Sequence, residues 1–362
     1  MKTTFLGHEL QSPIIVGSSP ASFGADAMIR CHEAGAGAVV CKTINRNAAE
    51  NPDLHMVVAG RETLMNCEKW TDFPMERWLD DEMPRAVAAG VKCIASVGHG
   101  IEDSRLCVER LEEIGVMAIE LVSYTDDTVL PMLEDTKRRV DIPVIVKLSP
   151  NSADLMGHAR RCVDAGADAL TACDSIGPAM RIDIETGKPF MGGADGCGWL
   201  TGAAIFPFTV ARIAALRQAL PEVPIIGLGG ITAWQDGIEF VQAGADAMGL
   251  ASAAILHGPG FITRMNARVD AWCAEHGVTD LAQIRGRVLE HLPVVQEDGY
   301  EMGFDFGKCR HCNQCVTACA YAARSVDEGG YAQVDEALCR HCGLCVSVCS
   351  FGALNLSKGQ VI

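Results

Sequence analysis

Apolar and polar residues alternate along the first 260 residues in a repeating order of strand and helix. The segment 165–170, Ala-Gly-Ala-Asp-Ala-Leu, follows an amphipathic stretch and leads into a β run, and close copies begin at Ala34 and Ala243. This order is typical of a helix end, a glycine turn and a new parallel strand. The junctions that begin at Asp141 and Glu222 lead into strands in the same way. Repetition of one β/α unit predicts an alternating α/β fold.

Eight segments have the short, apolar character of buried parallel strands. Eight such strands with interleaved helices favour a closed (β/α)8 TIM barrel, and an open doubly wound sheet is the alternative. The predicted strands are Ile14 to Gly17, Ala38 to Lys42, Cys93 to Val97, Ala118 to Val122, Val144 to Leu148, Ala169 to Cys173, Ile225 to Leu228 and Ala247 to Leu250.

The C-terminal segment holds eight of the chain's 17 cysteines, in two copies of the spacing C-x-x-C-x-x-C-x-x-x-C. This run is the signature of bacterial ferredoxins, where three cysteines of one run and the fourth of the other hold each 4Fe-4S cluster. Structural zinc and disulfides are the alternatives, but zinc usually takes paired C-x-x-C units separated by a longer loop, and cytosolic chains rarely keep disulfides. The expected groups are Cys309, Cys312, Cys315 with Cys349, and Cys339, Cys342, Cys345 with Cys319.

Length and composition fit two domains in a reducing compartment. We predict a barrel over residues 1–290, a linker over 291–302 and a small α+β ferredoxin-like domain over 303–362. The net charge of -16 argues against a nucleic-acid partner. The sequence lacks a secretion signal and any run of about 18 apolar residues, so no membrane association is expected. We therefore expect a cytoplasmic protein whose remaining cysteines are reduced thiols.

Function in such a barrel is expected where the strands end, on the carboxyl-terminal face. Lys42 and Lys147 stand at two strand ends, and the pairs Gly229-Gly230 and Ala251-Ser252 follow the last two strands. Loops after these strands commonly bind phosphate through backbone N–H groups, which glycine lets approach the oxygens closely. With the lysine pair and the iron–sulfur clusters, we expect the phosphate-bearing cofactor to be FMN.

Several short motifs together resemble one family of flavoproteins over nearly the whole chain. They are Lys42-Thr43, Asn66-Cys67-Glu68, Lys147-Leu148-Ser149-Pro150-Asn151, Gly198-Trp199-Leu200-Thr201-Gly202, Gly229-Gly230-Ile231 and Ala251-Ser252. The sequence resembles the dihydroorotate dehydrogenase and dihydropyrimidine dehydrogenase family, most of all the branch that joins an FMN barrel to a domain with two 4Fe-4S clusters. The resemblance implies that FMN is held by Gly17, Ser18, Lys42, Thr43, Lys147, Gly202, Gly229, Gly230, Ala251 and Ser252.

The sequence departs from the family pattern where substrate would bind. After the fourth strand the family's asparagine position is Leu121 and its proton-donor position is Tyr124. The loop from Asp126 to Leu130 is short, and the family's asparagine-threonine pair after the sixth strand is Asp174-Ser175. Because several amide-reading groups are replaced, the family's substrates do not transfer to this chain.

We therefore predict an oxidoreductase that reduces or forms an activated C=C bond, with electrons entering through the clusters. Tyr124 is the first candidate for the proton donor, because it stands at the family's proton-donor position and a phenol stays protonated at neutral pH. His99 is the second candidate, Cys67 and Cys173 are the third, and Lys147 would stabilise negative charge on the reduced flavin.

Candidate substrate contacts are Asn66, Glu68, Asp174 and Ser175. The two carboxylates would suit a substrate with N–H donors or a positive charge. A carboxylated substrate would instead need one of the arginines Arg46, Arg61 and Arg181. The sequence leaves both substrate classes open.

The sequence contains no G-x-G-x-x-G fingerprint of a nicotinamide-binding unit. We therefore expect a separate FAD- and NAD(P)H-binding reductase subunit or a ferredoxin as the electron donor. The resemblance favours a homodimer. The alternatives are a dihydropyrimidine or dihydroorotate dehydrogenase subunit proper, a non-catalytic electron-transfer subunit, and a degenerate barrel kept for binding.

Overall fold

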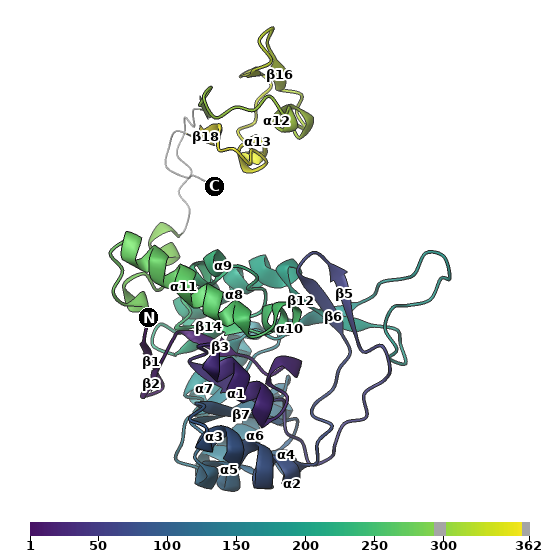
Figure 1. Cartoon of the computed structure of the whole chain (residues 1–362), viewed down its shortest axis with the longest axis vertical. Coiled ribbons are helices and arrows are strands. Elements are labelled where there is room, and N and C mark those ends of the chain that lie inside the picture. Colours follow the sequence, from purple (N-terminus) through teal and green to yellow (C-terminus); the bar gives the residue numbers. More distant parts are fainter. Residues whose placement is uncertain (293–301, 357–362) are drawn as a thin grey trace. The chain divides into compact units, whose positions relative to one another are not determined.

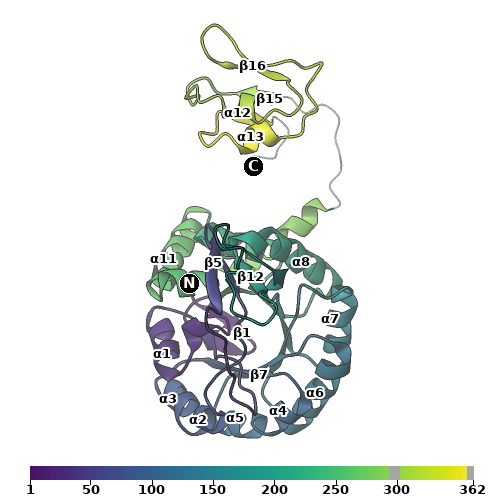
Figure 2. The same ribbon diagram turned by 90° about the vertical axis from the view of Figure 1, so that its right-hand side faces the viewer.

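In the computed structural model the chain divides into two compact units, Met1–Leu292 and Pro293–Ile362. The structure describes residues 1–292 and 302–356, so most of the predicted linker, 291–302, lies outside the described residues. The first unit is a barrel of strands inside a ring of helices, which Figures 1 and 2 show from two sides. Among the described residues, none of the helices combines the length and apolar character needed to cross a bilayer.

The eight predicted strands form a closed parallel barrel, which confirms the TIM barrel. Each strand pairs with its neighbour in sequence, and the last closes on the first through the register Met248 to Ile14. The strands are β3 (Ile14–Val16), β4 (Ala38–Val40), β7 (Cys93–Gly98), β8 (Ala118–Val122), β9 (Val144–Lys147), β10 (Ala169–Ala172), β13 (Ile225–Leu228) and β14 (Ala247–Leu250).

The longer helices that cover the barrel bury one face each against the strands. In α7, the residues Leu155, His158, Ala159 and Cys162 are buried at the spacing of one helix face. The helices of this unit are α1 (Ala25–Glu33), α2 (Met75–Arg77), α3 (Met83–Ala88), α4 (Ile101–Arg105), α5 (Val108–Ile114), α6 (Asp126–Arg139), α7 (Leu155–Asp164), α8 (Phe206–Ala219), α9 (Trp234–Ala243), α10 (Ser252–His257) and α11 (Gly260–Glu275).

The barrel interior changes from apolar to polar toward the carboxyl ends of its strands. Side chains alternate along a strand, so residues two apart face the same side. Ile145 of β9 belongs to an apolar cluster with inward residues of the other strands. The next inward residue of β9 is Lys147, and Glu120 likewise follows the inward Ala118 of β8. The strand period therefore directs these two buried charges toward the site.

A second sheet lies in the loops that follow β4 and β10, and the sequence pattern did not predict it. Its strands have the order β11-β12-β6-β5 and pair antiparallel, so that Trp199 stands opposite Asn66. Figure 1 shows β5, β6 and β12 beside the barrel. The strands are β5 (Met56–Gly60), β6 (Thr63–Asn66), β11 (Ile176–Ala179) and β12 (Gly198–Gly202), and a separate hairpin is formed by β1 (Thr3–Phe5) and β2 (His8–Leu10).

The second unit repeats one strand–helix–strand arrangement. The outer pair β15–β18 and the inner pair β16–β17 are both antiparallel. A short helix contains the third cysteine of each run, and buried Val346 and Leu354 form part of the small core of this unit. The elements are β15 (Met302–Phe304), α12 (Gln314–Thr317), β16 (Arg324–Val326), β17 (Ala332–Val334), α13 (Leu344–Ser347) and β18 (Leu354–Leu356).

Candidate active site

A cavity of about 770 Å³ opens at the carboxyl ends of the barrel strands. This volume lies within the range of roughly 300–1,000 Å³ that is usual for small-molecule sites. Among the residues predicted from the sequence, the cavity is lined by Ser18, Lys42, Thr43, Asn66, Glu68, His99, Tyr124, Lys147, Asp174, Ser175, Gly229, Gly230, Ala251 and Ser252.

Two predicted flavin contacts, Gly17 and Gly202, are not among the residues that line this cavity. The Gly17 N–H donates to the carbonyl of Leu250 at 2.7 Å, so it joins the first strand to the last. Gly202 has a φ of 87°, and a Cβ there would lie 2.1 Å from the carbonyl oxygen of Glu62. A Cβ at Gly17 would lie 3.0 Å from the Cδ1 of Leu228, so both glycines have a packing reason that is independent of a ligand.

Lys147, Asp174 and Tyr124 form a continuous polar chain at the centre of the cavity. The Lys147 Nζ lies 3.3 Å from the Asp174 Oδ2, and the Tyr124 phenol donates to the same oxygen at 2.9 Å. The Ser175 N–H donates to the other oxygen, Oδ1, at 2.8 Å. The carboxylate is therefore held in one orientation by three donors, from the end of β9, from the loop after β8 and from its own loop after β10.

Burial and pairing together set the charges of this chain. Burial alone would raise the pKa of Asp174, but the Lys147 ammonium, with the Ser175 and Tyr124 donors, holds that pKa below its ordinary value. The pKa of Lys147 is raised because Asp174 and Glu120 outweigh the cost of its burial. Burial and the Asp174 charge raise the pKa of the Tyr124 phenol well above its ordinary value. The resting state is thus an ion pair with a protonated phenol.

Glu120 is a buried acid below the cavity that the sequence reasoning missed. It is 1% exposed, and its Oε2 accepts from the Thr171 hydroxyl at 2.7 Å. Its Oε1 has no hydrogen-bond partner among the described residues. Burial raises the pKa of this carboxyl, although Lys147 opposes the shift. The sequence did carry a signal for this residue, because Glu120 is a single acidic residue within the apolar run from Ala118 to Val122.

Lys42 and Glu68 form a second ion pair in the cavity. Their Nζ and Oε2 atoms are 2.7 Å apart, and both side chains are close to fully buried. Burial lowers the pKa of Lys42, although Glu68 opposes the shift. Nearby, the hydroxyls of Ser18 and Thr43 lie 3.2 Å apart. Glu68 is therefore already neutralised by a partner of the protein itself.

The other proton-donor candidates are placed less favourably. His99 lines the cavity with its ring centroid 6.1 Å from that of Tyr124, and burial lowers its pKa, which favours the neutral ring. Cys173 also lines the cavity, but burial raises the pKa of its thiol to about 12. Cys67 does not line it.

The arginines that were considered for a carboxylated substrate lie outside the cavity. Arg181 donates to the carbonyl of Ala59 at 2.5 Å, and Arg46 pairs with Asp103 at 3.7 Å. Neither they nor Arg61 line the cavity, whereas Arg161 does. Arg161 was missed because it lies within α7, and its guanidinium is held by Asp126 at 2.8 Å and Asp154 at 3.1 Å.

The residues of this cavity fit FMN. The backbone at Gly229 and Gly230 and Ser252 at the start of α10 line the cavity together, and such backbone and hydroxyl donors are what a phosphate-bearing cofactor needs. The glycine pair also has a packing role, because a Cβ at Gly230 would lie 2.5 Å from the Cα of Phe206.

The ferredoxin-like unit brings one expected group of cysteines around a small cavity, which Cys309, Cys312, Cys315 and Cys349 line. Four thiols around one space are the donor set that a 4Fe-4S cluster needs. The backbone N–H of Ala353 also donates to the Cys349 sulfur at 3.3 Å. Despite some burial, such N–H groups hold the pKa of this thiol below its ordinary value.

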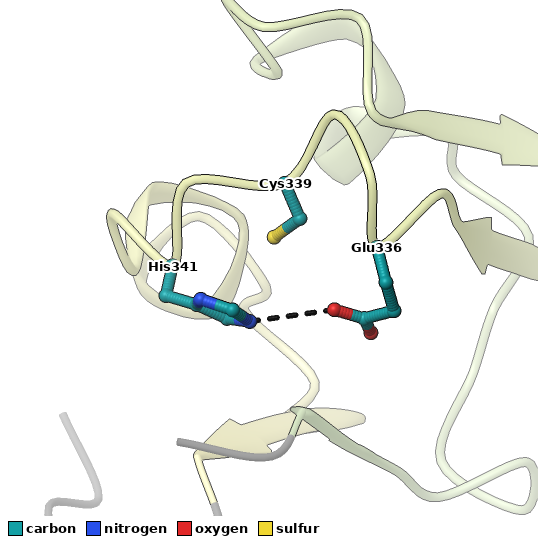
Figure 3. Close-up of side chains that lie close together, drawn as sticks. All are labelled: Glu336, Cys339 and His341. Carbon is teal, nitrogen blue, oxygen red and sulfur yellow. Dashed lines mark ion pairs between the residues drawn. The ribbon is translucent and has the colours of Figure 1, made fainter. Parts of the chain in front are cut away.

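The other expected group contains Cys339, whose surroundings Figure 3 shows. Here the His341 ring faces the Glu336 carboxylate, with Nε2 and Oε2 3.3 Å apart, and the Cys339 sulfur lies beside them. Because Cys339 is a predicted cluster ligand, we regard this group as part of the cluster site and not as a separate metal site.

A barrel with this polar cavity, joined to a unit with two cysteine groups, defines an iron–sulfur oxidoreductase class. Residues 116–271 match the family model of dihydroorotate dehydrogenase, and residues 308–353 match that of the 4Fe-4S dicluster domain. The dihydroorotate dehydrogenase B (NAD(+)) catalytic subunit of Listeria innocua is 30% identical over 301 residues, which cover 78% of this chain and 96% of that protein. Its namesake from Thermococcus kodakarensis is 29% identical over 303 residues, with the same coverage.

The chain therefore belongs to the dihydroorotate dehydrogenase family. It is an oxidoreductase that acts on a carbon–carbon bond of a small molecule, and its cofactors are FMN and two 4Fe-4S clusters.

Proposed function

We propose that this chain exchanges electrons with an activated C=C bond of a neutral small molecule and that Tyr124 is the proton donor. The observation that carries the proposal is the polar chain in which the Tyr124 phenol lies 2.9 Å from Asp174, itself paired with Lys147. Tyr124 and Asp174 stand where the family pattern has a proton donor and a neutral amide.

Neutral substrates are favoured because the buried lysines of the cavity are each paired with a carboxylate of the protein, whereas Lys69, which also lines the cavity, is exposed. Lys42 pairs with Glu68, Lys147 with Asp174, and Arg161 with two carboxylates. A charged substrate would have to break one of these pairs, which costs free energy when the remaining partner stays buried. A neutral unsaturated heterocycle or enone could be bound by hydroxyl and amide groups such as that of Asn66 without breaking any of these ion pairs.

The residues of the chain would move one proton in each turnover. When bound, FMN supplies or accepts the hydride. Tyr124 would transfer its phenolic proton to the substrate carbon, since a carbanion next to a carbonyl is a stronger base than a phenolate. Asp174 orients the phenol, and the Lys147 ammonium offsets the charge of the carboxylate beside the phenolate that forms.

For the cysteines we propose the ligand grouping expected from the sequence. Cys309, Cys312 and Cys315 line one cavity with Cys349, which supports the first group. The second group is then Cys339, Cys342, Cys345 and Cys319.

Electrons would enter or leave through these clusters. The relatives are named NAD(+)-dependent catalytic subunits, which supports a separate reductase subunit as the partner, with a ferredoxin as the alternative. Light scattering on the purified protein tests the homodimer that the family resemblance favours.

Anaerobic reoxidation tests the proposed substrate class. The holoprotein is reduced, freed of reductant and mixed with neutral enones, unsaturated heterocycles, charged enoates or orotate, while flavin absorbance is followed. We expect neutral compounds to reoxidise the flavin fastest. Preference for orotate would instead indicate the activity named for the relatives. Reoxidation by a partner protein alone would favour the electron-transfer subunit and contradict the proposal.

A further inference from the structure

The two repeats of the ferredoxin-like unit differ at one buried position. Arg324 stands five residues after Cys319, and Leu354 stands five residues after Cys349. Each is the first residue of its strand, β16 or β18. Both side chains are buried, at 7% and 3% exposed. The first repeat thus has a cation at the position where the second repeat has an aliphatic side chain.

The Arg324 guanidinium points at a cysteine of the second group. Its Nη2 lies 3.4 Å from the Sγ of Cys345, and the contact is buried. Strand β16, which begins with Arg324, follows Cys319 in the sequence. Cys319 is the fourth cysteine of the first run and belongs to the same proposed second group as Cys345. In the other repeat, Leu354 lines the cavity of the first group, together with apolar neighbours such as Ala332 and Ala353.

Among the described residues of this unit, Arg324 has no carboxylate partner of the kind that a buried cation normally has. Within residues 302–356, none of the ion pairs includes Arg324, although Lys308 and His341 each pair with a carboxylate. A buried charge without a counter-charge is strongly disfavoured. In the described part of this unit, the negative charge beside this guanidinium would be that of the cysteine thiolates and of the cluster they would hold.

We propose that Arg324 donates a hydrogen bond to the Cys345 sulfur and raises the reduction potential of the second cluster above that of the first. A cation and an N–H donor at a ligand sulfur stabilise the added negative charge of the reduced cluster more than that of the oxidised one. The first cluster has Leu354 at the equivalent place and receives no such stabilisation. Arg324 is therefore a residue that makes the two clusters unequal.

This inequality orders electron flow within the unit. The second cluster is reduced first and holds its electron, and the first cluster is the stronger reductant. The inference rests on the proposed cysteine grouping, which iron and sulfide analysis of cysteine variants tests separately.

The test is an EPR-monitored redox titration of the full-length holoprotein and its Arg324→Leu variant, which copies the residue of the other repeat. We expect two separated midpoint potentials in the native protein. In the Arg324→Leu variant, the higher midpoint potential should fall until the two midpoint potentials nearly coincide. The iron content should stay the same. Arg324→Gln, which keeps an N–H donor without the charge, should give an intermediate shift.

Arg340→Leu is the matched control, because Arg340 is exposed and its Nη1 donates to the carbonyls of Ala337 and Cys339. It removes the same charge near the same cysteine group but outside the buried contact. Equal shifts in Arg324→Leu and Arg340→Leu, or unchanged potentials in Arg324→Leu, would overturn the proposal. If Arg324→Leu fails to assemble clusters, the Arg324→Gln titration decides in the same way.

Discussion

Tyr124 shows at the level of a single residue how the surroundings define a chemical role. Its side chain is 44% exposed, yet its hydroxyl donates to the half-buried Asp174. The raised pKa makes the phenol a weak acid that remains protonated over the whole working range of pH. Such a group can donate only to a strong base, which protects the site against unproductive loss of the proton.

Tyr124→Phe is expected to slow flavin reoxidation by an unsaturated acceptor by about 10²–10⁴-fold, the usual contribution of general acid catalysis. FMN content and the rate of flavin reduction should stay unchanged, because the phenol acts on the substrate alone. Stopped-flow absorbance measures both half-reactions. Tyr321→Phe, at an exposed tyrosine of the ferredoxin-like unit, is the control. Native reoxidation rates in Tyr124→Phe would rule out the assignment.

The sequence predicted where the charged residues would lie but not how they would pair. Lys42 and Lys147 were placed correctly because strand ends can be located from apolar runs. Their partners Glu68 and Asp174 come from loops whose paths depend on tertiary packing, so the two ion pairs could not be read from spacing. Glu120 stood in a strand that had been located, and period-two alternation from Ala118 would have placed it in the barrel.

At the level of elements, the predictable parts were those whose burial is complete. Parallel strands are covered on both faces and therefore read as continuous apolar runs, and β8 has the predicted bounds, Ala118–Val122. The sheet of β5, β6, β11 and β12 was not predictable, because its short strands lie within long loops and pair across distant parts of the chain. The loop predicted from Asp126 to Leu130 is wrong, because these residues form the first turns of α6, which begins at Asp126. The connection from β8, which ends at Val122, to α6 is nevertheless short.

Asp135 connects α6 to α4 through a buried carboxylate. It is 5% exposed and accepts from Arg105 of α4 at 3.0 Å and from Arg138 and Arg139 of its own helix. The Arg105 guanidinium, assisted by the other two, holds the pKa of this carboxyl well below its ordinary value. The interaction is therefore present at neutral pH and is lost only in acid.

Asp135→Asn should destabilise the barrel by about 2 kcal/mol at pH 7, the usual scale of charge-assisted hydrogen bonds. Because the folded-state pKa is depressed, the native advantage is complete above the unfolded pKa of about 3.9 and shrinks as pH falls further. Thermal unfolding between neutral and acid pH measures the difference.

Glu113→Gln serves as the control, since its pair with Arg110 is exposed and is expected to contribute less than about 1 kcal/mol. An equal loss in both variants, or a gap that does not change in acid, would contradict the assigned role of Asp135.

At the scale of the whole molecule, the chain combines a two-electron site with two one-electron sites. The barrel was recognisable from eight repeated units and the ferredoxin-like unit from eight cysteines, because both patterns recur along the sequence. The difference between Arg324 and Leu354 stands in the sequence too, but its meaning needs the fold. Only the structure shows that the arginine is buried against Cys345.

The complete chain should therefore accept about four electrons, two at the flavin and one at each cluster. Anaerobic titration with a calibrated reductant, followed at flavin and iron–sulfur wavelengths, measures this number. Cys345→Ala should lower it to about three with loss of one cluster's iron, because Cys345 belongs to a single proposed group. Cys197→Ser, at a partly exposed cysteine outside both groups, should keep the native count. A native count of about two would show that the clusters do not exchange electrons with the reductant, and loss of both clusters in Cys345→Ala would contradict the separate grouping of the cysteines.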